Sequence, residues 1–167
     1  ETDQEKQKRL EQMDAVEMGG YTVRLVLPHE TWAVRSSVLW PEKAADDACR
    51  LEVDSDDGVF HFGVICEDEV VGIGSFMPQE HPHLEPTIAY RLRAMATHSD
   101  HRGIGVATML IRQAESVLKK QGVGGIWADA RKGALGFYAG LGWEVTGAFY
   151  TVPKRGPHRL VWTRFDE

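Results

Sequence analysis

Apolar residues recur along this chain at two spacings, and the spacing separates strands from helices. From Tyr21 to Leu27 apolar and polar residues alternate, which predicts a half-buried strand. Between residues 105 and 121 the apolar positions recur every three or four residues, which predicts an amphipathic helix. Its apolar face consists of Ala107, Leu110, Ile111, Ala114, Val117 and Leu118.

The same patterns give the order of the other elements. A helical stretch runs from Pro28 to Pro41, and an acidic, irregular segment follows over 42–58. Further strands are predicted at 59–66, 70–77, 87–97, 125–130, 144–150 and 158–165, with a short helix at 134–141. The strands before and after the long helix should be parallel neighbours, because a helix connects them. The other pairings are predicted to be antiparallel, so we expect a mixed α/β sheet with helices on both faces.

The first twenty residues differ from the rest. They are highly charged and end in Gly19-Gly20, so we expect an N-terminal extension over 1–20 outside a domain over 21–167. Leu10, Met13 and Val16 recur at helical spacing, which predicts a weakly amphipathic helix on the domain or on a partner.

Composition narrows the class of protein. A chain of 167 residues fits one domain. Its formal net charge of -6 and pI near 5.6 argue against a broad nucleic-acid surface. The absence of a long apolar run and of a signal-peptide pattern predicts a cytoplasmic protein with no membrane partner. Cys49 and Cys66 have no metal-ligand spacing, so we expect two reduced thiols and no metal.

The most informative segment is Arg102-Gly103-Ile104-Gly105-Val106-Ala107, between the 87–97 strand and the long helix. A glycine turn at a helix N-terminus directs backbone N–H groups and the positive end of the helix dipole at one point, which suits an anion. A nucleotide P-loop would need a Gly-Lys-Ser/Thr ending, which is absent. A dinucleotide-binding turn would need a third small residue where Thr108 stands.

Arg102, Gly105 and Ala107 form the pattern Arg-x-x-Gly-x-Ala, and here the sequence resembles the GNAT superfamily of N-acyltransferases. The resemblance includes the preceding strand over 91–98, the Phe-Tyr-Ala-Gly-Leu-Gly-Trp segment over 137–143, and Gly156-Pro157-His158 before the last strand. It covers residues 21 to 167. It implies a mixed, mostly antiparallel sheet of six to seven strands with helices on both faces and a central, splayed parallel pair.

The resemblance also assigns a cofactor site. Backbone amides of Arg102, Gly103, Ile104, Gly105, Val106 and Ala107 would bind the pyrophosphate of acetyl-CoA, and small residues allow that close approach. Met95, Ala96 and Thr97 would lie along the pantetheine arm, with the Met95 N–H as oxyanion donor. Tyr138 would act as general acid toward the departing thiolate, since a phenol stays protonated at neutral pH.

The residues expected on the acceptor side differ from the pattern of the family. Members often carry a glutamate or histidine base where this strand offers Arg91 and Arg93, and arginine remains protonated. Glu85, His61, His83 and His158 are candidate bases, and none is assigned. The two arginines would bind an anionic acceptor, form salt bridges to the acidic loop Asp46–Asp57, or only support the sheet. Trp32 and Trp40 would pack in the core, or one of them, with His158, would line the acceptor pocket.

The resemblance therefore implies an acetyl-CoA-dependent N-acetyltransferase that acts on a primary amine by direct transfer in a ternary complex. The acceptor would be a small molecule, a protein N-terminus or a lysine, and the enzyme a monomer or homodimer. A non-catalytic acyl-CoA sensor would keep the phosphate turn without a working acid or acceptor pocket. A nicotinamide-dinucleotide binder is the third alternative.

Overall fold

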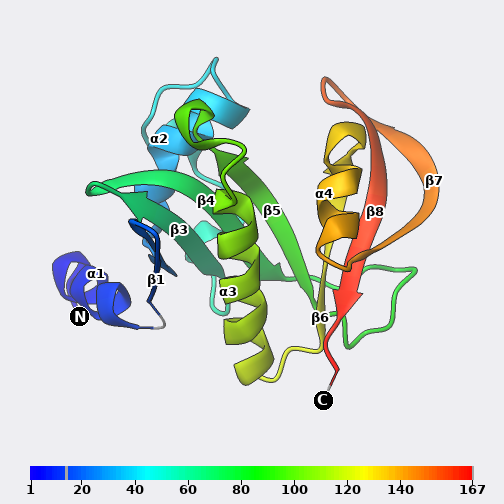
Figure 1. Cartoon of the computed structure of the whole chain (residues 1–167), viewed down its shortest axis with the longest axis horizontal. Coiled ribbons are helices and arrows are strands. Elements are labelled where there is room, and N and C mark those ends of the chain that lie inside the picture. Colours follow the sequence, from blue (N-terminus) through cyan, green and yellow to red (C-terminus); the bar gives the residue numbers. More distant parts are fainter. Residues whose placement is uncertain (14, 167) are drawn as a thin grey trace. The chain divides into compact units, whose positions relative to one another are not determined.

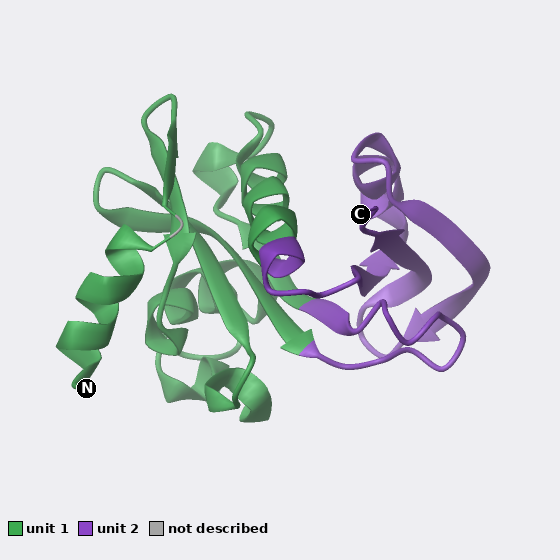
Figure 2. Ribbon diagram, turned by 90° about the horizontal axis from the view of Figure 1, so that it is seen from below, with its two compact units in different colours: residues 1–77, 93–117 green, residues 78–92, 118–167 purple. Residues whose placement is uncertain are grey.

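The computed structural model describes residues 1–13 and 15–166 (Figure 1). The chain divides into two compact units (Figure 2). Unit 1 comprises residues 1–77 and 93–117, and unit 2 comprises residues 78–92 and 118–167. The chain passes from one unit to the other within two strands and within the long helix.

The described residues form eight strands, joined in the order β1-β2-β3-β4-β5-β6-β8-β7. Strands β5 and β6 are parallel, whereas the pairs β1–β2, β2–β3, β3–β4, β6–β8 and β7–β8 are antiparallel. The expected mixed, mostly antiparallel sheet is therefore confirmed, with eight strands where six to seven were expected. The strands are β1 (Val16–Met18), β2 (Tyr21–Leu25), β3 (Phe60–Cys66), β4 (Glu69–Pro78), β5 (Tyr90–Thr97), β6 (Gly125–Arg131), β7 (Glu144–Val152) and β8 (Gly156–Arg164).

Strand β1 was not predicted, and the prediction that placed Val16 on a helix with Leu10 and Met13 was wrong, because the helix ends at Gln12 and Val16 begins β1. Strand β1 has three residues, all exposed, so it is too short to show the alternation over four to eight residues that marks a half-buried strand. Gly19 and Gly20 have φ angles of +54° and +86° and turn the chain from β1 into β2, with Val16 opposite Val23. The preceding helix α1 buries Leu10. A separate extension over 1–20 and a domain over 21–167 stay predictions.

The helices follow the sequence with one local difference. The predicted stretch from Pro28 begins as a 3-10 turn and widens into π-helical turns, where the Trp40 N–H donates to the Arg35 carbonyl at 2.8 Å. The α-helices are α1 (Asp3–Gln12), α2 (Trp32–Val34), α3 (Val106–Lys120) and α4 (Leu135–Gly140). Shorter helical segments are η1 (Pro28–Thr31), η2 (Arg35–Leu39, π-helical), η3 (Asp47–Cys49), η4 (Glu52–Ser55), η5 (Ser99–His101) and η6 (Lys132–Ala134).

Unit 1 packs helices on both faces of its strands. On one face, Val34 of α2 contacts Ile73 of β4 and Ala96 of β5 in an apolar cluster. The adjacent residue Gly72 points to the other face, where a Cβ would come within 2.7 Å of Val106 at the start of α3. Glycine is therefore needed for α3 to lie close to the sheet. The predicted apolar face of α3 is buried at Leu110, Ile111, Ala114, Val117 and Leu118.

Unit 2 contains the start of β5 and the strands β6, β8 and β7. Its parallel pairs are Tyr90 with Ile126 and Arg91 with Trp127, as the strand-helix-strand pattern predicts. Ile88, Trp127 and Leu160 form its apolar cluster, and the Trp127 indole N–H donates to the Gln79 carbonyl at 2.7 Å. That hydrogen bond ties the 79–89 loop to β6.

Candidate functional site

The glycine turn singled out by the sequence leads into α3 and lies wholly in unit 1. Gly103 and Gly105 have φ angles of +78° and +90°, a region that residues with a side chain rarely adopt. Both glycines and the intervening Ile104 are exposed. The first N–H groups of the 15-residue helix α3 have no partner inside the helix. The turn therefore presents N–H donors and the positive helix end at one exposed place.

Open space lies beside both glycines of this turn. A Cβ built on Gly103 or Gly105 would meet nothing within 4 Å, so packing does not require glycine at these positions. The backbone conformation requires it instead. Arg102 is tied to the end of β5, where its Nε donates to the Thr97 carbonyl at 3.3 Å. The donor set suits the pyrophosphate of coenzyme A, which carries negative charge and needs N–H partners.

The segment expected to hold the pantetheine arm follows an irregularity in β5. Ala94 has a φ of +54° within the strand, which is unusual for a residue with a side chain. After it, Ala96 is buried in the cluster with Ile73, while Met95 and Thr97 are only half-buried. Successive strand residues point to opposite faces. Met95 and Thr97 therefore lie on the face away from Ile73.

Tyr138 lies on α4 in unit 2 and is almost fully buried, with 6% of its surface exposed. Its ring centroid is 5.2 Å from that of Phe137 and 5.1 Å from that of Trp143. Burial raises the pKa of the Tyr138 phenol well above its ordinary value, so the group stays protonated. Tyr138 is therefore protonated, as a general acid must be, and its catalytic role stays a prediction.

Arg91 contacts a residue that the sequence patterns did not single out. Its Nη2 donates to Asp129 Oδ2 on the neighbouring strand β6 at 2.7 Å, and its Nη1 donates to Gln79 Oε1 at 3.3 Å. Its guanidinium also lies 4.9 Å from the centroid of the Trp127 ring. Asp129 is thus the carboxylate partner of Arg91, rather than a residue of the acidic loop Asp46–Asp57.

Asp129 has a second partner, Tyr150 of β7, whose hydroxyl donates to Asp129 Oδ1. Desolvation, and then this hydrogen bond, raise the pKa of the Tyr150 phenol well above its ordinary value. The Tyr150 ring stacks on His158 of β8, with 6.4 Å between the centroids. The His158 Nδ1 lies 2.9 Å from the Gly156 carbonyl. Unit 2 therefore brings the predicted residues Arg91 and His158 together through Asp129 and Tyr150.

The remaining acceptor-side candidates lie in different surroundings. Trp40 packs against cations, 4.9 Å from the Lys43 amine and 6.0 Å from the Arg35 guanidinium. Arg93 is half-buried on β5 in unit 1. Glu85 forms an exposed ion pair with Arg164 at 2.9 Å. His83 is exposed, and its ring lies 5.6 Å from that of His81.

His61, another candidate base, belongs to a buried network in unit 1. The Arg35 guanidinium contacts the Asp54 carboxylate at 2.6 and 3.0 Å, and both side chains are fully buried. Arg35 also donates to Ser75 Oγ at 3.0 Å. His61 Nε2 lies 2.8 Å from the Asp54 carbonyl and Nδ1 lies 2.7 Å from Ser75 Oγ.

Protonation of His61 follows from this network. A carbonyl only accepts, so Nε2 carries the hydrogen and Nδ1 accepts from the Ser75 hydroxyl. Burial lowers the pKa of His61, although the carbonyl and charge of Asp54 oppose the shift. His61 is thus held neutral with both ring nitrogens engaged. This arrangement favours a structural role over that of a base.

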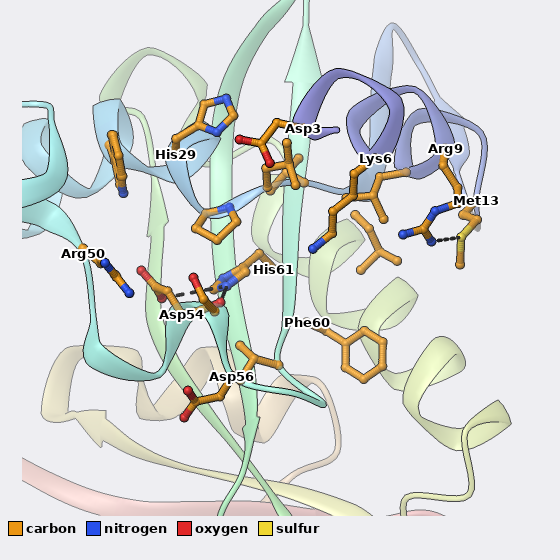
Figure 3. A pocket seen from close by; sticks show the side chains of 18 residues that line it. Asp3, Lys6, Arg9, Met13, His29, Arg50, Asp54, Asp56, Phe60 and His61 are labelled. Carbon is orange, nitrogen blue, oxygen red and sulfur yellow. Dashed lines mark hydrogen bonds and ion pairs between the residues drawn. The ribbon is translucent and has the colours of Figure 1, made fainter. Parts of the chain in front are cut away.

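A pocket of about 470 Å³ borders the same network in unit 1 (Figure 3). It is lined by α1, by the chain around η1 and by the beginning of β3, with charges of both signs. Lys6, Arg50 and Asp56 contribute charge, and Trp32 contributes an indole. The indole nitrogen of Trp32 is buried with no hydrogen-bond partner among the described residues. Trp40, the other tryptophan considered for the acceptor side, does not line it.

Formal charge differs between the units. Unit 1 contains ten lysines and arginines against nineteen acidic residues, whereas unit 2 contains nine against six. The cations of unit 2 that lie within nine residues of Asp129 or Tyr150 in the sequence include Arg131, Lys132, Lys154, Arg155 and Arg159. The protein as a whole is acidic, and unit 2 is its basic part.

Comparisons with known proteins identify the family. The acetyltransferase (GNAT) family matches residues 26–143. The N-acetyltransferase YitI of Bacillus subtilis (strain 168), whose name describes it as uncharacterized, is 34% identical over 140 residues, which is 84% of this chain and 93% of YitI. This chain belongs to the GNAT family and is an acetyltransferase.

Solved structures support the fold. The ribosomal-protein-S5-alanine acetyltransferase of Vibrio fischeri is 18% identical with a TM-score of 0.68, over 92% of this chain and 97% of that one. An aminoglycoside 6'-N-acetyltransferase complexed with coenzyme A is 16% identical with a TM-score of 0.65, over 81% and 88%. Among the described residues, no helix is long and apolar enough to cross a membrane.

Proposed function

We propose that this enzyme transfers the acetyl group of acetyl-CoA to a primary amine by direct attack in a ternary complex. The observation that carries the proposal is the turn from Arg102 to Ala107, where two glycines with positive φ expose the N-terminus of α3. The turn would hold the pyrophosphate through backbone N–H groups. Acetyl-CoA supplies an activated acetyl thioester.

The end of β5 would position that thioester. The backbone of Met95, Ala96 and Thr97 would pair with the pantetheine arm, and the irregular Ala94 supports a break in regular strand pairing there. The Met95 N–H would stabilise negative charge that develops on the thioester oxygen.

Tyr138 would protonate the departing thiolate. Its burial keeps the phenol protonated, whereas a thiol ionises at a lower pH, so the phenol can donate without ionising first. The aromatic contacts with Phe137 and Trp143 would hold its ring in place.

The acceptor would bind at Arg91, Arg93, Trp40 and His158. The names of two structural relatives give a ribosomal-protein alanine and an aminoglycoside as acceptors. Both fit a primary amine as the general class. We propose the cytoplasm as the place of action and a monomer or homodimer as the assembly.

Calorimetry with coenzyme A tests the proposal directly. Alanine at Gly105 must adopt a left-handed backbone, which costs about 1–2 kcal/mol and should weaken binding about 5- to 30-fold. Gly133→Ala is the matched control, because Gly133 also has open space but no positive φ, and it should bind as the wild type does. Absence of affinity in the wild type would refute the proposal.

Turnover separates an enzyme from a sensor. Acetyl-CoA is mixed with a library of primary alkylamines, amino acids and aminoglycosides, and released thiol is measured. An enzyme releases thiol with at least one amine, whereas a sensor binds coenzyme A without releasing any.

A further inference from the structure

A continuous hydrogen-bonded chain of polar side chains crosses the strands of unit 2. Arg91 of β5 donates to Asp129 of β6, and Tyr150 of β7 donates to the other oxygen of the same carboxylate. His158 of β8 stacks on the Tyr150 ring. Each residue comes from a different strand, so the sheet itself holds the four in place.

The direction of the Tyr150 hydrogen bond fixes what its oxygen can do. Asp129 also accepts from Arg91, and an ionised carboxylate only accepts, so the phenol gives its hydrogen to Asp129. The lone pairs of the Tyr150 oxygen are then left to accept from another donor. Tyr150 is 38% exposed, so a ligand can reach the residue. Its raised pKa keeps it a protonated phenol rather than a phenolate.

We propose that Tyr150 and Asp129 form the proton relay that deprotonates the acceptor ammonium, a role that the sequence left unassigned. The inference rests on the proposed function. The ammonium gives one hydrogen to the Tyr150 oxygen as the phenol hydrogen moves to Asp129 Oδ1. The amine nitrogen keeps the electron pair of its broken N–H bond and uses it to attack. Asp129 then returns the proton to solvent through Tyr150.

Arg91 acts as a positioning residue in this relay. Its contact at Asp129 Oδ2 and its contact with Gln79 hold the carboxylate so that Oδ1 faces Tyr150. The side chains of Arg91 and Asp129 are only 24% and 27% exposed, which limits rotation of the pair.

His158 is the competing base within the same cluster. Its Nδ1 donates to the Gly156 carbonyl, so a neutral ring has its lone pair on Nε2. Its register partner on β6 is Arg131, another charged neighbour of the cluster. His158 is buried, with 4% of its surface exposed, whereas Tyr150 is accessible. This difference in exposure favours Tyr150 as the group that meets the acceptor.

The test uses the full chain and the first amine from the library that releases thiol with the wild type. Tyr150→Phe keeps the ring stacked on His158 and removes only the hydroxyl. At pH 6.5 we expect kcat/KM to fall about 10²- to 10⁴-fold, the size of general base catalysis. The loss should shrink as the pH approaches the pKa of the amine, because the free amine needs no base. Asp129→Asn should show the same rescue at high pH.

Matched variants separate loss of the relay from a change in packing or in cofactor binding. Phe149→Leu changes the neighbouring exposed aromatic of β7 and should keep kcat/KM within about twofold of the wild type. A loss in Tyr150→Phe that does not depend on pH, or no loss, would overturn the relay. If His158→Gln alone shows the rescue, His158 is the base.

Coenzyme A affinity of each variant, measured by calorimetry, should remain unchanged. Failure of the wild type to bind it would defeat the proposed function instead.

Discussion

Two arginine–aspartate ion pairs occur among the residues that the structure describes, and they differ in their surroundings. Arg35 and Asp54 in unit 1 are fully buried, and Ser75 and the Cys49 carbonyl also accept from Arg35. Arg91 and Asp129 in unit 2 are about a quarter exposed, and Asp129 also accepts from Tyr150. The first pair ties the irregular 42–58 segment to the sheet, whereas the second presents polar groups to solvent. Burial therefore favours a structural role for the first pair, whereas the second pair is accessible enough for the chemical role that we propose.

Removal of each carboxylate should give the largest difference in stability between the two pairs. Asp54→Ala leaves the buried guanidinium of Arg35 without its counter-charge, so we expect the free energy of unfolding to fall by about 3–5 kcal/mol. Asp129→Ala should cost at most about 1 kcal/mol, because water reaches that pair. Urea unfolding followed by circular dichroism measures both. Equal losses would show that burial does not distinguish the pairs.

Replacing both members of the buried pair tests why Asp54→Ala is destabilising. Arg35→Met with Asp54→Leu removes both charges and leaves apolar groups. It should be more stable than Asp54→Ala alone, because no buried charge remains uncompensated. A double variant as unstable as Asp54→Ala would mean that the loss comes from the loop's other contacts.

Arg91→Ala should change which acceptors are preferred. Without Arg91, the negative charge of Asp129 has no guanidinium beside it, so an acceptor with a carboxylate should be disfavoured. We expect KM to rise about 3- to 10-fold for an amine that carries a carboxylate, relative to its neutral amide. Steady-state kinetics on the two acceptors measures the ratio. Equal effects on both would remove Arg91 from acceptor selection.

Acidification should have the smallest effect on the free energy of unfolding, and this effect should come from His61. The folded pKa of His61 lies below its ordinary value of about 6.5, so below that pH the unfolded chain binds a proton that the folded chain does not. Stability should thus fall as the pH drops below 6.5, by about 1 kcal/mol between pH 7.5 and 5.5. Urea unfolding at these two pH values measures the change, and His61→Gln should reduce it.

Asp54 should add a further loss only at lower pH. Burial alone would raise its pKa, but the hydrogen bond and charge of Arg35 outweigh that effect and lower it. Its contribution is therefore complete above about pH 4 and disappears as the carboxylate is protonated below that value. If the Asp54→Asn variant still loses stability below about pH 4, other carboxylates are responsible for that loss.

Local sequence patterns predicted most of the elements because each depends on residues close in the chain. The apolar face of α3 and the alternation of β2 are such patterns, and the structure confirms both. Strand β1 was missed because its three exposed residues are too few to show a strand pattern. Arg35 did carry a signal, since a charge stands among Val34, Val38 and Leu39 on an apolar helix face.

The sequence by itself determined the order of helices and strands, the glycine turn before α3 and the resemblance to the GNAT family. Only the tertiary structure decided that Arg91 and Tyr150 meet at Asp129, and that Arg35 meets Asp54. Those contacts join strands and loops far apart in the chain, so they depend on sheet register and burial. No local spacing encodes which carboxylate a given arginine will reach.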